Sequence, residues 1–339
     1  MLDILGLLKQ IALVPGTSSF EYPRAEAIMR IAAPHCDEVH VDPIGSVVAF
    51  IKGKPGGKKI MMSAHMDSIG VIAVYVEEDG RVRYEMLGGI NPNTFLNSTV
   101  VFENGVVGSV GADKEQAAYN HHDMFIDIGA KTREEALSLI SLGDTAAYRS
   151  DAILQGGVLI SRYLDDLICC VIQICAMERI KESENDLYFV FSVQEEIGAF
   201  GAVVGAKTIL PDIGIALDVT SSNDTRKPKG RGPIALGKGP AIKIKDASVI
   251  CSAQVNALLK EAASREGIPV QHEILIGGGT DTPEIQASGG GVPASCISVP
   301  TLYIHSPSEM CSLSDVENCV KLLCAAITGK IERLVTHYA

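Results

Sequence analysis

The sequence contains no tryptophan, and aromatic residues make up only 5% of its 339 residues. Sugar-binding proteins stack the sugar rings on aromatic side chains, so this composition disfavours a carbohydrate ligand. Basic residues are also scarce, since 29 Lys and Arg against 41 Asp and Glu give 29 − 41 = −12 charges at pH 7. Nucleic acids and anionic membranes both require a basic surface, so we expect neither as a partner.

Long apolar runs and paired cysteines are absent as well. No uninterrupted apolar stretch reaches the roughly 18 residues of a membrane-spanning helix. The opening MLDILGLLKQIALVPG lacks a basic segment and repeats leucine and isoleucine at helical spacing, which predicts an amphipathic helix rather than a signal peptide. Nine cysteines occur without a CxxC pair. This disfavours a disulfide framework or a thiolate metal site, and we expect a cytoplasmic protein with reduced thiols.

The order of helical and strand-like segments predicts an α/β fold with an insertion. Residues 1–70 and 157–339 alternate strands with helices, which is typical of a mostly parallel sheet flanked by helices on both faces. Residues 71–156 instead contain short β-type runs separated by Gly, Asn and Asp. Such spacing predicts a small β-barrel or sandwich inserted into the larger domain.

Acidic and imidazole side chains follow several predicted strands where each strand ends. His65 and Asp67 follow IMMSA, Glu195 and Glu196 follow YFVFSVQ, Asp218 follows IGIAL, His305 follows CISVPTLYI, and Asp165 and Asp166 precede the apolar helix LICCVIQICAM. Ligands of open α/β sheets bind outside the carboxyl ends of the strands, so we expect these groups to converge in one crevice. A carboxylate beside an apolar strand needs a partner or a metal ion.

Each of these groups alone has an ordinary interpretation. A histidine at a strand end is usually a satisfied structural residue, and Asp165 or Asp166 would serve as a helix N-cap. Together they suit two divalent cations about 3.5–4 Å apart, which clamp the attacking and leaving oxygens of a hydrolysis. Mixed His and carboxylate ligands favour zinc or cobalt. One carboxylate must stay off the metals to take a proton, and the adjacent Glu195 and Glu196 can divide these roles.

Six motifs then occur in order: AHMDSIG at 64–70, LDD at 164–166, QEEIGAFGA at 194–202, ALDVT at 216–220, GGTD at 278–281 and YIHSPSE at 303–309. Together with FIDIGAKTREEA at 125–136, they resemble the glutamyl aminopeptidase and tetrahedral aminopeptidase family of dinuclear metallopeptidases. Some members of that family are labelled endoglucanase M or deblocking aminopeptidase. The resemblance extends over essentially the whole chain. It implies a zinc-peptidase-like fold and removal of amino-terminal residues from short peptides by a metal-bridging hydroxide.

The resemblance also implies the metal ligands. Carried over position by position, it makes Asp165 the bridge between two divalent ions, zinc or cobalt. His65 and Asp218 would complete the ligands of one ion. Glu196 and His305 would complete those of the other.

Further roles follow from the same resemblance. Glu195 would be the general base and later the proton donor to the leaving amine. Asp67 would orient the imidazole two residues before it, as ligands of metal sites require. The loop that contains Gly279, Thr280 and Asp281 would line the substrate pocket, with a plain tight turn as the alternative.

The resemblance further implies that the insertion is a PDZ-like or β-barrel dimerisation domain. It implies a homo-oligomer in which dimers assemble into a hollow tetrahedral dodecamer. The chain departs from the family pattern at Ser68, where Glu is usual, and at Leu167 and Leu302, where Arg is common. None of the three is a predicted ligand, so the departures bear on substrate preference and oligomer contacts.

Other functions remain open from the sequence alone. A glycosidase of the endoglucanase type could use paired carboxylates without metal, but it would leave the histidines unexplained. A non-catalytic protein that keeps the fold is compatible with Leu167 and Leu302. A dipeptidase or carboxypeptidase of the same clan would share the metal centre. His121 and His122 fall in a polar loop of the insertion, where solvated side chains are expected.

Overall fold

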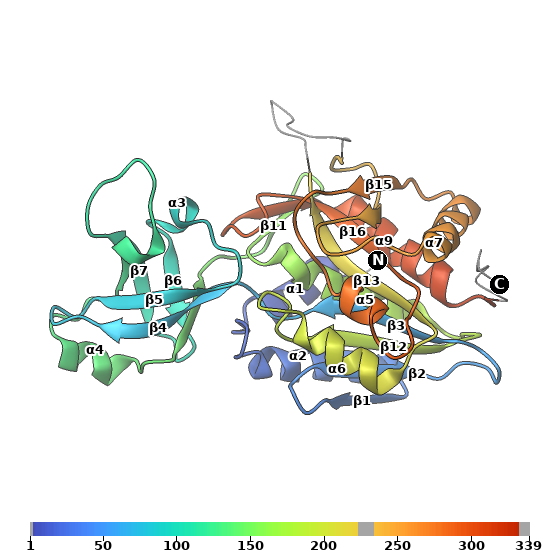
Figure 1. Cartoon of the computed structure of the whole chain (residues 1–339), viewed down its shortest axis with the longest axis horizontal. Helices are drawn as coiled ribbons and strands as arrows, with labels where there is room; N and C mark the ends of the chain where they lie inside the picture. Colours follow the sequence, from blue (N-terminus) through green and yellow to red (C-terminus); the bar gives the residue numbers. More distant parts are fainter. Residues whose placement is uncertain (1–2, 223–233, 332–339) are drawn as a thin grey trace.

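The computed structural model describes residues 3–222 and 234–331. It consists of a large α/β part and a small barrel that projects from one side of it (Figure 1). Among the described residues, the large part is built on an 11-stranded sheet, and the small part is a closed barrel. The predicted α/β class with an inserted β-barrel is therefore confirmed.

Four neighbouring parallel strands form the centre of the large sheet. They are β12 (Asp186–Ser192), β3 (Lys59–His65), β13 (Ile213–Ser221) and β16 (Ala294–Leu302). Their residues are almost entirely buried, as expected for parallel strands covered on both faces. The parallel strands end at the same edge of the sheet, which brings residues distant in sequence together.

Antiparallel strands flank this centre on both sides. One side carries β2 (Val47–Ile51) and β1 (Glu38–Val41), and the other carries β17 (Glu309–Ser312), β11 (Val158–Ser161) and β10 (Ile153–Gln155). A further pair, β14 (Ala241–Lys245) and β15 (Gln271–Ile274), joins through β16. The sheet is therefore mixed. Parallel pairing occurs among the four central strands and between β14 and β15, and the other neighbours pair antiparallel.

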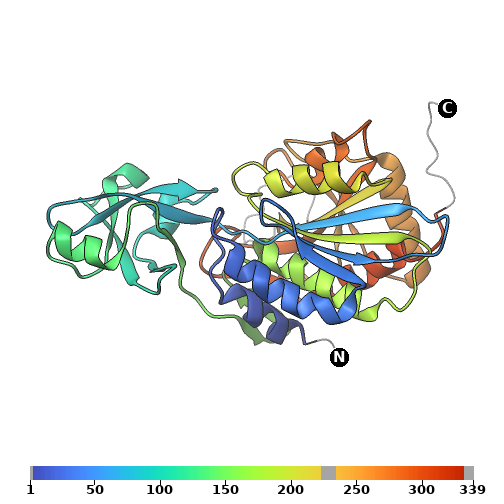
Figure 2. The ribbon, with the colours of Figure 1, turned by 90° about the horizontal axis from the view of Figure 1, so that it is seen from below.

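Helices cover both faces of the sheet (Figure 2). One face carries α1 (Ile4–Ala12), α2 (Tyr22–Ala32), α5 (Leu164–Arg179) and α9 (Leu313–Ile327), and α7 (Ala253–Glu266) packs on α9. The other face carries α6 (Phe200–Ile209) and α8 (Thr282–Gln286). Helix α5 is buried from Leu164 to Met177. Its nearly continuous apolar sequence is that of a helix enclosed on all sides. Leu167, one of the departures from the family pattern, lies in this core.

The barrel is formed by residues between β3 and β10. Its strands are β4 (Gly70–Val76), β5 (Val82–Leu87), β8 (Met124–Asp127), β7 (Val107–Ala112), β6 (Thr99–Phe102) and β9 (Thr145–Tyr148), with α3 (Pro92–Phe95), η2 (His121–Asp123) and α4 (Arg133–Leu139) in the connections. The buried rings of Tyr84, Phe95 and Tyr148 pack edge to face, with centroids 5.6 and 5.3 Å apart. These contacts form an aromatic cluster inside the barrel, and this cluster is continuous with the core of the large part.

The buried guanidinium of Arg24 joins the loop before α2 to the end of β3. It donates hydrogen bonds to the carbonyl oxygens of Ile11, Val14, Gly16 and Met66 and to Ser68 Oγ. Burial lowers the pKa of Arg24 to about 10. Ser68, another departure from the family pattern, is thus a contact of this cation. Arg24 therefore contacts the residues on both sides of Asp67, through the Met66 carbonyl oxygen and the Ser68 hydroxyl.

We expect Arg24→Met to lower the free energy of unfolding by about 3 kcal/mol or more, because it leaves several carbonyl oxygens without donors. Urea unfolding of the two proteins measures this difference. Arg30→Met, on the exposed face of the same helix, is the matched control and should change stability by about 0.5 kcal/mol or less. Equal effects of the two substitutions would contradict the role given to Arg24.

Candidate metal centre

The predicted ligands meet at the carboxyl ends of the parallel strands. His65 ends β3, Glu195 and Glu196 follow β12, Asp218 lies in β13, His305 follows β16, and Asp165 lies at the start of α5. All six side chains line one cavity of about 380 Å³. Gly89, on the connection that follows β5 of the barrel, lines the same cavity.

His65 is held from one side so that its other nitrogen faces the cavity. Its Nδ1 lies 3.1 Å from the backbone oxygen of Asp67 and 3.4 Å from Oδ1 of the same residue. Its Nε2 lies 3.0 Å from Asp165 Oδ1 and 4.0 Å from Glu195 Oε2. Burial opposes a charge on His65, but hydrogen bonds to Asp165 and Asp67 outweigh burial and raise its pKa well above its usual value. The imidazole therefore presents Nε2 to the carboxylates.

The two oxygens of Asp165 face two different imidazoles. Oδ1 lies 3.0 Å from His65 Nε2, and Oδ2 lies 3.2 Å from His305 Nε2. The same His305 nitrogen is 3.4 Å from Glu196 Oε1, and its Nδ1 is 2.8 Å from the carbonyl oxygen of Gly89. Burial raises the pKa of Asp165, but the hydrogen bonds from His305 and His65 prevail and lower it. The carboxylate of Asp165 is thus shared between His65 and His305.

Buried carboxylates crowd the rest of the crevice. Burial, together with repulsion from neighbouring carboxylates, raises the pKa of Asp166, Glu195, Glu196 and Asp218. Asp166 Oδ1 is buried without a hydrogen bond from any described residue, and Glu196 Oε1 is contacted by His305 Nε2 at 3.4 Å. Such a concentration of negative charge needs a compensating cation.

The donor set fits divalent metal ions. Two groups of three side chains place their donor atoms within 4.8 Å of one another. The first group is His65, Asp165 and Glu196, and the second is His65, Asp166 and Asp218. Imidazole nitrogens and carboxylate oxygens are the ligands of zinc and cobalt hydrolases, whereas a purely oxygen shell would suit magnesium or calcium. The residues present can therefore hold the metal ions that the sequence predicts.

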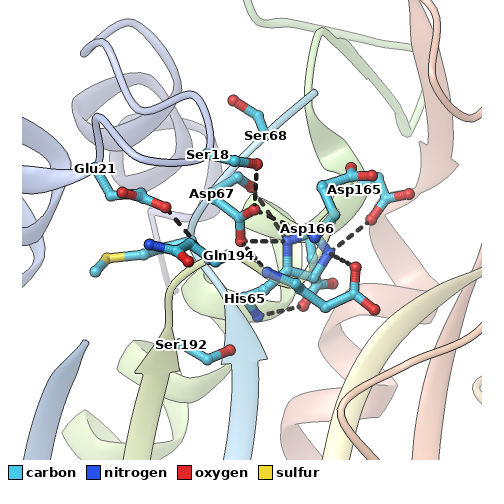
Figure 3. Close-up of polar contacts among 12 residues, drawn as sticks. Ser18, Glu21, His65, Asp67, Ser68, Asp165, Asp166, Ser192 and Gln194 are labelled. Atoms are coloured by element: carbon cyan, nitrogen blue, oxygen red, sulfur yellow. Dashed lines mark hydrogen bonds and ion pairs between the residues drawn. The ribbon is translucent and has the colours of Figure 1, made fainter. Parts of the chain in front are cut away.

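Asp67 connects the end of β3 to the loop that carries the two glutamates. Its carboxylate accepts hydrogen bonds from Ser18 Oγ at 2.7 Å, from the Glu195 amide at 2.9 Å and from the Glu196 amide at 3.3 Å. Figure 3 shows Asp67 between Ser18 and His65. Burial raises the pKa of Asp67, but the contact with His65 and these hydrogen bonds lower it overall. One buried carboxylate thus positions His65, Glu195 and Glu196.

Glu309 plays a similar part and was not singled out from the sequence. Its side chain is buried, and its two oxygens accept hydrogen bonds from the amides of Asp165 and His305, each at 2.8 Å. It therefore orients the backbone of both residues. The signal was available, because Glu309 ends the motif YIHSPSE, but a glutamate in a polar loop is usually solvated.

The glycine-rich loop is divided between the cavity and the protein interior. Gly279 lines the cavity. Thr280 and Asp281 are only 3% exposed and are not among its lining residues. Asp281 instead accepts hydrogen bonds from Ser63 and Ser192, both at 2.6 Å, and so fastens the loop to β3 and β12.

Comparison with known proteins places the chain in one family. Residues 45–322 match the family described as M42 glutamyl aminopeptidase. A protein of Acetivibrio thermocellus is 44% identical to this chain, and the alignment covers 96% of this chain and 98% of that protein. A solved aminopeptidase from Desulfurococcus kamchatkensis has a TM-score of 0.92 and 33% identity, covering 96% of this chain and 94% of its own. A Pyrococcus horikoshii TET1 peptidase has a TM-score of 0.85 and 31% identity, and the match covers 96% of this chain and 99% of that peptidase. That peptidase is described as able to assemble into a tetrahedron or a large octahedral shell.

The imidazoles and carboxylates gathered at the strand ends of the α/β sheet form a candidate metal centre, and the family of the chain gives the class of reaction. The chain belongs to the M42 glutamyl aminopeptidase family, and its activity is that of an aminopeptidase. The resemblance of the sequence motifs to this family is confirmed. Within the described residues, no helix is both long and apolar enough to cross a membrane.

We expect a chelator to lower the melting temperature, and added Zn²⁺ or Co²⁺ to restore it, because the bound cations offset the repulsion among the carboxylates. A metal at 100 times its Kd stabilises the folded protein by about 2.7 kcal/mol. Thermal unfolding of the stripped and reloaded protein measures the shift. Asp165→Asn should reduce it, and a melting temperature unaffected by metal would contradict the assignment of a metal centre.

Proposed function

We propose that the chain is a dinuclear metallo-aminopeptidase acting on short peptides, with Asp165 shared between two divalent cations. His65 and Asp218 complete the ligands of one cation, and Glu196 and His305 those of the other. The observation that supports this most is the position of Asp165, whose two oxygens lie 3.0 and 3.2 Å from two different imidazoles. Zinc and cobalt are the ions that such mixed ligands favour.

The chemistry that such a pair of cations supplies when bound is polarisation of the scissile carbonyl and a lowered pKa of the attacking water. The protein holds the six ligating and acid–base side chains for this chemistry in one buried cavity. Asp67 and Glu309 fix the backbone amides beside those side chains. Fixed positions of this kind lower the cost of reorganisation in the transition state.

Glu195 is the general base in this proposal. It takes the proton of the attacking water and later gives a proton to the leaving amine. Its amide is fixed by Asp67, and its carboxylate lies 4.0 Å from His65 Nε2, at the edge of the proposed ligand set rather than within it. Burial raises its pKa, which moves the carboxylate towards the range where proton exchange at neutral pH is efficient.

The charge and size of the cavity support action at the amino end of a peptide. Its carboxylates attract an α-ammonium group, and Val219, Leu275 and Ile304 supply apolar walls for a side chain. A cavity of about 380 Å³ is at the small end of ligand pockets and suits the first residues of a peptide rather than a folded chain.

We further infer a homo-oligomer in which the barrel is the dimerisation domain, with dimers assembling into a dodecamer. The assembly described for the P. horikoshii relative supports this. Leu137, Leu139 and Leu142 of the barrel are 44%, 42% and 56% exposed, and apolar side chains of this kind are common at protein interfaces. A cytoplasmic location is inferred as well, since all nine cysteines are unpaired.

Glu195→Gln should lower kcat on aminoacyl chromogenic substrates by about 10²–10⁴-fold, because the amide cannot take a proton. KM and metal content should stay near the wild-type values. Glu38→Gln, an exposed position of β1, is the control. Wild-type turnover by the Glu195 variant would exclude it as the base, and no turnover by either protein would favour a non-catalytic member of the family.

Acetylation of a peptide's amino end should reduce its cleavage by about 100-fold or more, since it removes the charge that the carboxylates attract. Amidation of the carboxyl end should leave the rate unchanged. Mass spectrometry of a peptide and its two blocked forms gives the three rates. Cleavage that depends on a free carboxyl end would indicate a carboxypeptidase instead.

A further inference from the structure

A second group of imidazoles and a carboxylate lies in the barrel, apart from the catalytic crevice. Glu85 belongs to β5, and His121 and His122 belong to the short helix η2 that precedes β8. One donor atom of each residue lies within 4.8 Å of the others, as in the ligand groups of the crevice. The loop histidines, which were expected to be solvated, therefore converge on an acidic residue of a neighbouring segment.

The contacts place the carboxylate of Glu85 against both rings. Glu85 Oε2 lies 3.1 Å from His121 Nε2, and Oε1 lies 3.8 Å from His122 Nδ1. The two rings lie side by side, with centroids 3.9 Å apart. The separation of Glu85 and His121 matches the 3.0–3.2 Å between Asp165 and its two imidazoles in the crevice.

The turn that carries the histidines is held by its own hydrogen bonds. Asn120 accepts a hydrogen bond from the His122 amide at 3.1 Å, and the Asp123 amide donates to the carbonyl oxygen of Asn120 at 3.0 Å. The next residue, Met124, accepts a hydrogen bond from Arg83 at 2.9 Å. The imidazoles are therefore presented to β5 by an ordered turn.

The surroundings favour a cation. The three residues line a cavity of about 390 Å³ together with Glu77 and Arg83. Arg83 is already paired with Glu77 at 2.7 Å and with Asp113 at 2.8 Å. Arg81 lies 3.7 Å from Asp113. The three carboxylates of Glu77, Glu85 and Asp113 thus outnumber the two guanidinium groups of Arg81 and Arg83.

We propose that Glu85, His121 Nε2 and His122 Nδ1 bind a divalent cation of the zinc, cobalt or nickel class. Imidazoles select these ions over calcium and magnesium, which prefer oxygen ligands. The side chains of Glu85 and His122 are 51% and 65% exposed, so they have room to turn towards an ion and leave positions for water. Because the ligands come from β5 and from the loop before β8, the ion fastens that loop to the barrel wall.

Metal counting tests this site. The wild-type chain and the double variant His121→Ala/His122→Ala are equilibrated with Zn²⁺, freed of unbound ion and analysed for zinc per chain. We expect the wild type to hold one more ion per chain than the double variant. Glu85→Gln, which keeps the shape of the side chain but removes its charge, should weaken Zn²⁺ binding at this site by about tenfold or more.

Two controls separate this site from the catalytic one. His40→Ala, which removes an exposed histidine of β1, should leave the zinc count unchanged. In an Asp165→Asn background, the difference of one ion between chains with and without the barrel histidines should persist, whatever the crevice binds. Circular dichroism and peptide hydrolysis show whether the barrel variants are folded. Equal zinc content in folded wild-type and double-variant chains would overturn the proposal.

Discussion

The main physical constraint on this structure is a buried cluster of carboxylates whose negative charges repel one another. Asp165, Asp166, Glu195, Glu196 and Asp218 surround one cavity or lie directly beneath it, and burial makes their mutual repulsion strong. Nearby imidazoles offset part of this charge, and divalent cations offset more when they bind. The fold therefore maintains an electrostatically unfavourable arrangement of side chains whose donor atoms fit divalent metal ions.

Two further carboxylates, which do not line the cavity, hold the backbone of the cluster's residues in place. Asp67 accepts hydrogen bonds from the amides of Glu195 and Glu196. Glu309 accepts hydrogen bonds from the amides of Asp165 and His305. Backbone amides are good partners for a buried carboxylate because they stabilise its charge at fixed geometry. The loops around the site are thus fixed by charges that lie behind the reacting groups.

Much of this arrangement could be predicted because it follows from local patterns. An acidic or imidazole residue directly after an apolar strand indicates a side chain at the end of a sheet, and this pattern identified His65, Glu195 and Asp218. The pattern could not identify Glu309, which follows a polar segment in the sequence and is buried because it begins β17, a strand that pairs with β11 and packs against α5. Asp281 was expected beside the substrate for a similar reason, since a glycine-rich motif does not reveal which of its residues turns inward.

The sequence by itself determined the α/β class, the inserted barrel and the residue types of the metal centre, because strand periodicity and strand-end residues are local properties. Only the tertiary structure decided that the sheet is mixed, that Asp165 stands between two imidazoles, and that His121 and His122 meet Glu85. These features join segments that are distant in the chain; Asp165 and His305, for example, are 140 residues apart. Their contacts depend on how the strands are ordered and how the loops pack, which no local pattern specifies.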